Sequence, residues 1–166
     1  SERRGLQEIV CAMGTLPERF RATFMLMPNP KLQHWLQDLI DASPARTRMR
    51  IVPPAPMREI PERINRYDME IVYLPPLTDN LRYASPNKFY EAIQGRLALA
   101  VRDDEVLAPL VKNWGNGIVV PGHSCRELAE ALSSLTATEV RQMKNASDKI
   151  ASQVNSSTEG VAFLQA

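Results

Sequence analysis

Residues 85–101, SPNKFYEAIQGRLALAV, contain a helix-to-strand transition that indicates the class of fold. Ser85 followed by Pro86 is typical of a helix start, because serine caps free backbone N–H groups and proline is tolerated in the first helical turn. Apolar residues then recur at helical spacing until Gly95. Leu97–Val101 is an unbroken apolar run, which is typical of a strand covered on both faces. The segment therefore predicts an amphipathic helix that leads into a buried strand.

The same alternation extends in both directions along the chain. Short apolar runs predict four more strands, at residues 22–27, 49–52, 69–74 and 117–120. Amphipathic patterns predict helices before, between and after them, and two of these follow S/T-x-x-E capping boxes at Ser124 and Thr136. Helices that alternate with buried strands predict a three-layer α/β domain, in which a Rossmann-like, mostly parallel sheet carries helices on both faces.

The first predicted element is a helix rather than a strand. Four apolar residues at helical spacing mark it: Leu6, Ile9, Val10 and Met13. A doubly wound α/β domain usually begins with a strand, and Ser1 is not an initiator methionine. We therefore expect residues 1–166 to be one domain excised from a longer protein, with its first strand lying before Ser1.

The composition fits a globular domain and excludes several classes of protein. The 166 residues, 44% of them apolar, suffice for a real core. Lysine plus arginine total 20 and aspartate plus glutamate 19, so the surface lacks the basic excess that attracts nucleic acid or anionic lipid non-specifically. No apolar run approaches the length of a membrane span, and no secretory signal opens the chain. These features predict a cytoplasmic protein without a transmembrane segment.

The cysteines and histidines show no spacing typical of metal ligands. Cys11 and Cys125 are far apart in the sequence, and neither His34 nor His123 has a cysteine or carboxylate at zinc spacing. We therefore predict no metal site. The two cysteines are expected to be unpaired, partly buried thiols of a reducing compartment.

Candidate ligand-binding residues gather at the start of the helix quoted above. Ligands of open parallel sheets bind at the carboxyl ends of the strands, and this helix follows one such end. Asn87 and Glu91 point away from its apolar face, and Lys88 lies on the flank. The amides and dipole of the helix start favour a phosphate, to which Lys88 adds a cation, while Glu91 is suited to ribose hydroxyls. The alternative is a solvated helix face with an ion pair between Lys88 and Glu91.

A second candidate lies at the opening of the chain. Arg3 and Arg4 would follow the missing strand and supply cations at the start of the first helix. Arginine is well suited to phosphate oxygens, because its planar fork matches their geometry. The alternative is an exposed pair of arginines at a flexible terminus.

Several motifs occur together in a consistent order. They are Arg4-Gly5-Leu6 at the first helix, then Pro86, Lys88, Glu91 and Ala92 within one helix, and finally Gly115–Pro121 followed by Glu127–Leu132. This combination resembles the donor-binding, C-terminal domain of glycosyltransferases with the GT-B fold. It is most similar to the large retaining family that builds bacterial polysaccharides and glycolipids, and the resemblance covers nearly the whole chain.

The resemblance implies one half of a GT-B glycosyltransferase, which transfers a sugar from a nucleotide-diphosphate sugar to a carbohydrate or lipid-linked acceptor. It implies that Lys88 and Arg4, with Asn87 beside them, bind the donor diphosphate and that Glu91 binds the ribose. The loop Thr78-Asp79-Asn80 is a candidate contact for the donor sugar. No cofactor is implied beyond the nucleotide-sugar itself.

The resemblance also implies a partner, the N-terminal acceptor domain of the parent enzyme, which is absent from this chain. Tyr83 stands where many members of the family carry a first glutamate, so the sequence identifies no catalytic residue. Because no Asp-x-Asp pair is present, the diphosphate charge would be met by Lys88, Arg4 and the helix amides. The alternative is a non-catalytic Rossmann-like nucleotide-binding or signalling module. Against it stand the lack of a G-x-G-x-x-G motif and of a phosphoacceptor aspartate at a strand end.

Overall fold

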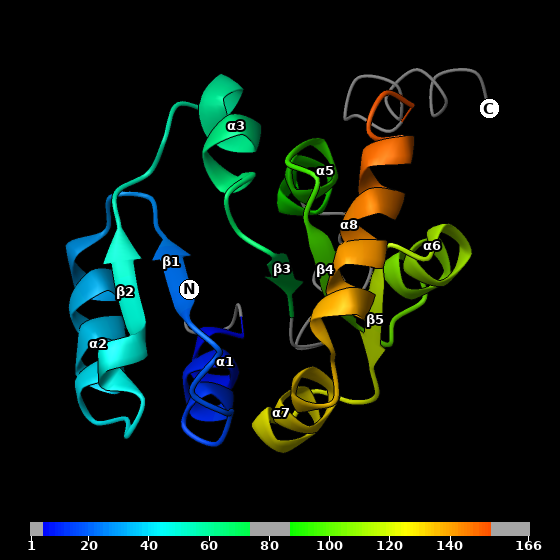
Figure 1. The fold of residues 1–166 in the computed structure, drawn as a ribbon. Coiled ribbons are helices and arrows are strands. Elements are labelled where there is room, and N and C mark those ends of the chain that lie inside the picture. Colours follow the sequence, from blue (N-terminus) through cyan, green and yellow to red (C-terminus); the bar gives the residue numbers. More distant parts are fainter. Residues whose placement is uncertain (1–4, 74–86, 154–166) are drawn as a thin grey trace.

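The computed structural model describes residues 5–73 and 87–153 and shows helices alternating with parallel strands (Figure 1). In chain order the elements are α1 (Leu6–Met13), β1 (Ala22–Met25), α2 (Pro30–Asp41), η2 (Arg46–Arg48), β2 (Met49–Val52), η3 (Met57–Glu59), α3 (Ile60–Ile64), β3 (Met69–Val72), α5 (Asn87–Gln94), β4 (Ala98–Arg102), α6 (Leu107–Trp114), β5 (Gly117–Val120), α7 (Cys125–Ser133) and α8 (Ala137–Ile150). Every strand pair is parallel. The predicted α/β class and its alternation of elements are confirmed.

The five strands of the described residues form two separate hydrogen-bonded groups rather than one continuous sheet. β1 pairs with β2, and β4 lies between β3 and β5. Among the described residues no strand pairing joins β1 to β3. This division differs from the single sheet expected from the sequence, because local apolar patterns do not report which strands are neighbours.

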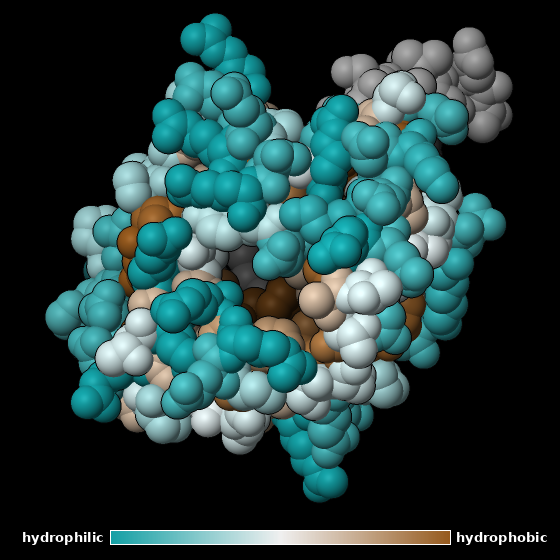
Figure 2. Space-filling model, in the orientation of Figure 1, coloured by the Kyte–Doolittle hydropathy of each residue, from teal (hydrophilic) through white to brown (hydrophobic). Residues whose placement is uncertain are grey.

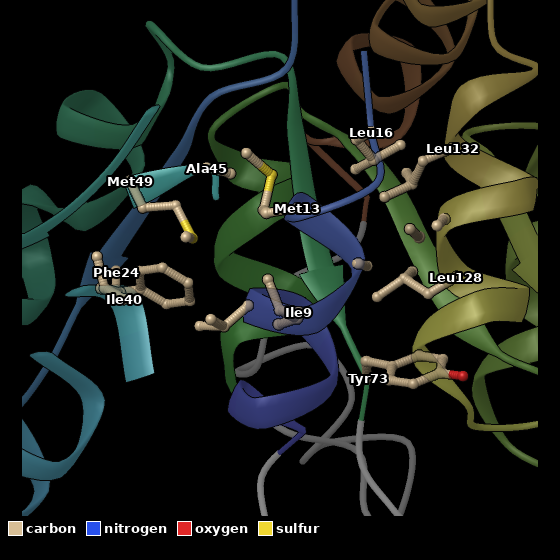
Figure 3. Close-up of a cluster of buried hydrophobic side chains, with 14 of the residues drawn as sticks. Ile9, Met13, Leu16, Phe24, Ile40, Ala45, Met49, Tyr73, Leu128 and Leu132 are labelled. Carbon is tan, nitrogen blue, oxygen red and sulfur yellow. The ribbon is translucent and has the colours of Figure 1, made fainter. Parts of the chain in front are cut away.

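Two apolar clusters lie on opposite faces of the strands. One is formed with α1, α2 and α7, and α1 lies at its centre. Figure 3 shows Ile9 and Met13 of α1 between two groups of side chains. These are Phe24, Ile40 and Met49 on one side and Leu16, Tyr73, Leu128 and Leu132 on the other. The second cluster packs α5 and α6 against the other face of β3, β4 and β5, so the domain has the predicted three layers.

The central strand is buried as predicted, whereas its neighbour is not. Leu97, Leu99 and Val101 are each at most 1% exposed. In β3, Val72 is buried, but the first three residues keep some exposed surface. Among the described residues of the predicted strand 69–74, which we expected to be buried on both faces, only Val72 and Tyr73 are fully buried.

The predicted capping boxes are both present. Ser124 caps α7 with Glu127, and Thr136 caps α8 with Glu139. The predicted start of α5 at Ser85 and Pro86 lies outside the described residues. None of the helices in the described part of the chain is long and apolar enough to span a lipid bilayer.

The prediction of unpaired cysteines is wrong. Cys11 of α1 and Cys125 of α7 form a disulfide, with their Cα atoms 5.7 Å apart. The two helices pack side by side on the same face of the sheet, as the apolar cluster around α1 shows. A separation of 114 residues in the sequence hides this proximity, which only the packing of α1 on α7 creates.

Candidate nucleotide-diphosphate site

The carboxyl end of β3 is the meeting point of several loops. Tyr73, directly after β3, is 1% exposed, and its hydroxyl donates hydrogen bonds to the carbonyl oxygens of Gly122 (3.2 Å) and Ser124 (3.3 Å). Burial, followed by the carboxylates of Glu127 and Glu8, raises the pKa of Tyr73 to about 12. The phenol therefore stays protonated at neutral pH and holds the loop after β5 against the end of β3.

The chain enters α1 at the same place. Gly5 has φ 76°, in the left-handed region, and a Cβ at this position would lie 1.9 Å from the carbonyl oxygen of Tyr73. Only glycine permits both this conformation and this close approach of two backbone segments. The Gly-Leu step of the Arg4-Gly5-Leu6 motif thus brings the start of α1 to the carboxyl end of β3. Arg4 itself lies outside the described residues.

Lys88 and Glu91 lie beside this strand end. Both are half-buried on α5, whereas Asn87 at the helix start is exposed. The Lys88 Nζ donates a hydrogen bond to the carbonyl oxygen of Ile71 in β3 (3.0 Å). Burial raises the pKa of the Glu91 carboxyl. The alternative of a fully solvated helix face therefore does not describe these two residues.

The sequence analysis did not identify a third charged residue near Lys88 and Glu91, which is Glu70 in β3. Burial raises the pKa of its carboxyl, the charge of Lys88 opposes that rise, and the charge of Glu91 adds to it. Glu70, Lys88 and Glu91 are thus close enough to interact electrostatically, and we refer to them as the carboxylate–lysine cluster. The available signal was a carboxylate inside the otherwise apolar run Met69–Val72, where a charged side chain is costly without a partner.

Comparisons with known proteins identify the fold. No protein-family model matches the sequence, and no curated protein matches it either. Solved structures do match. WaaG, a glycosyltransferase of lipopolysaccharide biosynthesis, is 15% identical with a TM-score of 0.65, over 92% of this chain and 40% of WaaG.

Two further solved structures match as well. The C-terminal domain of the group 1 glycosyltransferase LpcC from Francisella tularensis is 14% identical with a TM-score of 0.73, over 94% of this chain and 82% of that domain. HepE (Alr3699) from Anabaena, in complex with UDP, is 15% identical with a TM-score of 0.77, over 99% of this chain and 46% of HepE. This chain has the fold of a GT-B glycosyltransferase C-terminal domain. It spans less than half of the WaaG and HepE chains.

In this GT-B domain the structure brings together some of the predicted site residues. Lys88 and Glu91 lie on α5 beside the end of β3, and Gly5 places the start of α1 against the same strand end. The predicted donor-sugar loop Thr78-Asp79-Asn80 lies outside the described residues. Within residues 5–73 and 87–153, no group of three or more His, Cys, Asp or Glu side chains is arranged to hold a metal ion.

The start of α5 offers hydrogen-bond donors as well as charge. The first turn of any α-helix has N–H groups without partners in the helix, and its dipole is positive there. In this GT-B domain, Lys88 adds an ammonium group in the same turn, and Glu91 follows one turn later. Such an arrangement can bind a phosphate at the helix start and a hydroxyl-bearing group next to it.

Proposed function

We propose that this chain is the donor-binding domain of a glycosyltransferase and that it binds a nucleotide-diphosphate sugar at the carboxyl end of β3. The observation that supports this most is the position of Lys88 and Glu91, half-buried one helical turn apart beside that strand end. HepE, which shares the fold, has been solved in complex with UDP and with UDP-glucose.

In the proposed complex each group has a defined role. Lys88, the exposed Asn87 and the first-turn amides of α5 bind the diphosphate, with Arg4 as a further proposed cation. Glu91, in its ionised form, accepts hydrogen bonds from the ribose hydroxyls. When the sugar leaves, negative charge grows on the diphosphate, and the fixed cations and amides stabilise it electrostatically. The Lys88 ammonium exchanges its bond to the Ile71 carbonyl for one to a phosphate oxygen.

The transfer itself requires a second domain. We propose that the parent enzyme carries an N-terminal acceptor domain that faces this one across a cleft. The acceptor would be a carbohydrate or lipid-linked hydroxyl, in polysaccharide or glycolipid synthesis on the cytoplasmic side of a membrane. The short share of WaaG and HepE that this chain spans supports the existence of that further domain.

Binding of nucleotides to the purified chain tests the proposal. A thermal-shift screen with UDP, GDP, ADP and NAD identifies the base, because a ligand that binds only the folded state raises its stability. Titration calorimetry with the best nucleoside diphosphate then compares the affinities of Lys88→Ala and Glu91→Ala with that of the unsubstituted chain. A charge-assisted hydrogen bond contributes about 1.5–3 kcal/mol, so each change should weaken binding about tenfold or more.

Lys112→Ala is the matched control. Lys112 lies on α6, and its ammonium forms an exposed ion pair with Asp103. Its removal should leave nucleotide affinity unchanged. Equal nucleotide affinities in the Lys88, Glu91 and Lys112 variants would show that Lys88 does not bind the diphosphate and Glu91 does not bind the ribose. Preferential binding of NAD would favour a dinucleotide-binding module instead.

A further inference from the structure

The disulfide between Cys11 and Cys125 lies within reach of solvent. Cys11 is exposed on α1, and Cys125, the first residue of α7, is only partly buried. Exposed disulfides are the ones that external thiols reduce most readily. The amides and the positive dipole end of the first turn of α7 also stabilise a thiolate on Cys125, which makes its sulfur a good leaving group. The bond is therefore placed where a dithiol reductant can open it.

The opening of this bond is a thiol–disulfide exchange. A thiolate of the reductant attacks the Cys11 sulfur, the bond between the two cysteine sulfurs breaks, and Cys125 leaves as a thiolate. The second thiol of the reductant then attacks the mixed disulfide and releases Cys11. In total two electrons and two protons pass from the dithiol to the two cysteines, and the dithiol becomes a disulfide.

The two cysteines lie where the two strand groups are joined. The pair β1 and β2 shares no strand pairing with β3, β4 and β5 in the described part of the chain. Figure 2 shows the molecular surface hollowed between the two groups, with apolar side chains at the floor of the hollow. The apolar cluster around α1 includes side chains from both groups, and the disulfide adds a covalent link from α1 to α7. A change in this bond therefore acts on the region where the two groups meet.

The start of α7 and the loop before it form one unit. Ser124 and Glu127 make the capping box of α7, so Ser124 is fixed to the first helical turn. Gly122 has φ 80°, and a Cβ at this position would lie 2.4 Å from a carboxylate oxygen of Glu127, so the loop packs closely against the same turn. Cys125 belongs to this unit. Its bond to Cys11 therefore helps to set where the loop lies relative to α1.

Tyr73 connects this loop to the candidate nucleotide site. Its hydroxyl donates to the carbonyl oxygens of Gly122 (3.2 Å) and Ser124 (3.3 Å). Both distances are long for hydrogen bonds between oxygens, so a small displacement of the loop is enough to break them. Two residues before Tyr73 in the chain, the carbonyl of Ile71 accepts the hydrogen bond from Lys88. The loop, the end of β3 and Lys88 are thus connected in series.

These connections and α1 form a closed ring. Gly5, at the start of α1, packs against the carbonyl of Tyr73, and α1 leads from there to Cys11. The disulfide leads to Cys125, and the loop before α7 returns to the Tyr73 hydroxyl. Reduction opens this ring at the disulfide, whereas the apolar contact between α1 and α7 remains. The closed ring restricts the carboxyl end of β3 more than the open ring does.

We propose that Cys11 and Cys125 form a thiol–disulfide switch that controls nucleotide-diphosphate binding. This inference rests on the proposed function, because the regulated site is the one at the carboxyl end of β3. The oxidised form binds the nucleotide more tightly, since less ordering of the loop and of the strand end accompanies binding. Reduction by a dithiol weakens binding without displacing any group that contacts the ligand.

Titration calorimetry of the two redox forms tests the switch. The probe is UDP, GDP or ADP, whichever nucleotide stabilises the chain most, and alkylation followed by mass spectrometry verifies the state of the cysteines. At a temperature where circular dichroism shows both forms folded, the oxidised form should bind about fivefold or more tightly than the form reduced with dithiothreitol. The double variant Cys11→Ala, Cys125→Ala should bind like the reduced form, with and without dithiothreitol.

Tyr73→Phe tests the route from the disulfide to the site. Without the hydroxyl, the loop has no hydrogen bond to the end of β3, so the oxidised and reduced forms of this variant should bind the nucleotide equally. Tyr67→Phe is the matched control, because the Tyr67 hydroxyl accepts a hydrogen bond from Arg66 (3.2 Å) instead. This control should keep the full difference in affinity between the redox forms. A full difference in Tyr73→Phe would overturn the proposal.

The remaining outcomes separate the switch from the proposed function. Equal affinities of the oxidised and reduced unsubstituted chain would overturn the switch and leave the proposed function intact. A lack of nucleotide binding by both forms would overturn the proposed function and the switch with it. Unfolding of the chain on reduction at every temperature tested would show that the disulfide supports the whole fold rather than the site, and the switch would again be overturned.

Discussion

At the scale of single residues, Glu70 is the least expected feature. Strands of parallel sheets are normally apolar, yet β3 carries this carboxyl within electrostatic range of Lys88 and Glu91. Burial raises the pKa of both carboxyls, so the folded state disfavours their charged forms. Two carboxylates beside one ammonium suit a site that is completed by a further group with hydrogen-bond donors, such as a ribose.

The raised pKa of Glu70 predicts how stability changes with pH. Because the folded state holds the proton more tightly than the unfolded chain, Glu70 opposes folding as pH rises from its usual pKa of 4.5 through the raised value. Glu70→Gln should therefore raise the free energy of unfolding at neutral pH, and the gain should vanish below about pH 4. Urea denaturation at several pH values measures this. Glu62→Gln, at an exposed position of α3, should show little gain at any pH.

The residue types and their spacing predicted Lys88 and Glu91 as site residues. They did not predict which residues of other elements lie beside them. Lys88 and Glu91 could be selected because helical spacing places them on one side of α5, and that is a local property. Their electrostatic interaction with Glu70, and the hydrogen bond from Lys88 to the Ile71 carbonyl, depend on how α5 packs on β3, about twenty residues earlier. The sequence has no local signal for that packing. The pairing of Cys11 with Cys125 was missed for the same reason.

At the scale of elements, α8 is fixed to the sheet by a buried series of hydrogen bonds. The amide of Asn116 donates to the Ser147 hydroxyl (3.2 Å), and that hydroxyl donates to the carbonyl of Leu97 (2.6 Å). Asn116 and Ser147 are fully buried, so water cannot replace a lost partner without rearrangement. These two hydrogen bonds set the position of α8 along β4 and β5.

We predict that Ser147→Ala destabilises the domain by about 1–3 kcal/mol, because it leaves the Asn116 amide and the Leu97 carbonyl without this partner. Chemical denaturation measures the loss. The control is Ser133→Ala in α7, where an exposed hydroxyl donates only to the Glu130 carbonyl one turn earlier. Similar losses of unfolding free energy in the two variants would mean that the buried hydrogen bonds contribute nothing beyond an ordinary surface contact.

The order of elements was predictable because it depends on short patterns. Alternating apolar runs and amphipathic helices gave all five strands in place, and the two capping boxes gave the starts of α7 and α8. The division into two strand groups was not predictable from those patterns. It depends on which strands are adjacent, and β2 and β3 follow each other in sequence without pairing.

At the scale of the whole molecule, the two strand groups are joined through α1. The apolar cluster around α1 includes side chains from both groups (Figure 3). The disulfide ties α1 covalently to α7.

Reduction of the disulfide should destabilise the chain. A bond across 114 residues restricts the unfolded chain, and loops of that length correspond to a contribution of about 2–5 kcal/mol. Urea denaturation with and without dithiothreitol should show this difference. In the double variant Cys11→Ala, Cys125→Ala the reductant should have no effect. A parent chain that is equally stable with and without reductant would contradict the prediction.

We predict that the chain of 166 residues binds nucleotide-sugar weakly and transfers no sugar. Holding the acceptor hydroxyl next to the anomeric carbon can account for about 7–11 kcal/mol of the activation barrier, and one domain cannot provide that alignment. A radiolabelled-donor assay that compares this chain with the proposed two-domain enzyme measures it. Transfer by this chain at a rate near that of the parent would show that the acceptor site lies within residues 1–166.

The packing of α1 on α7 also affects how the protein folds during its synthesis. A ribosome adds about 5–20 residues per second, so α1 emerges several seconds before α7. During that interval the apolar face of α1 that later contacts Leu128 and Leu132 is uncovered, although the members of the cluster that precede α7 have already been synthesised. We therefore expect the nascent domain to depend on late, long-range contacts and to need protection by chaperones until α7 has left the ribosome.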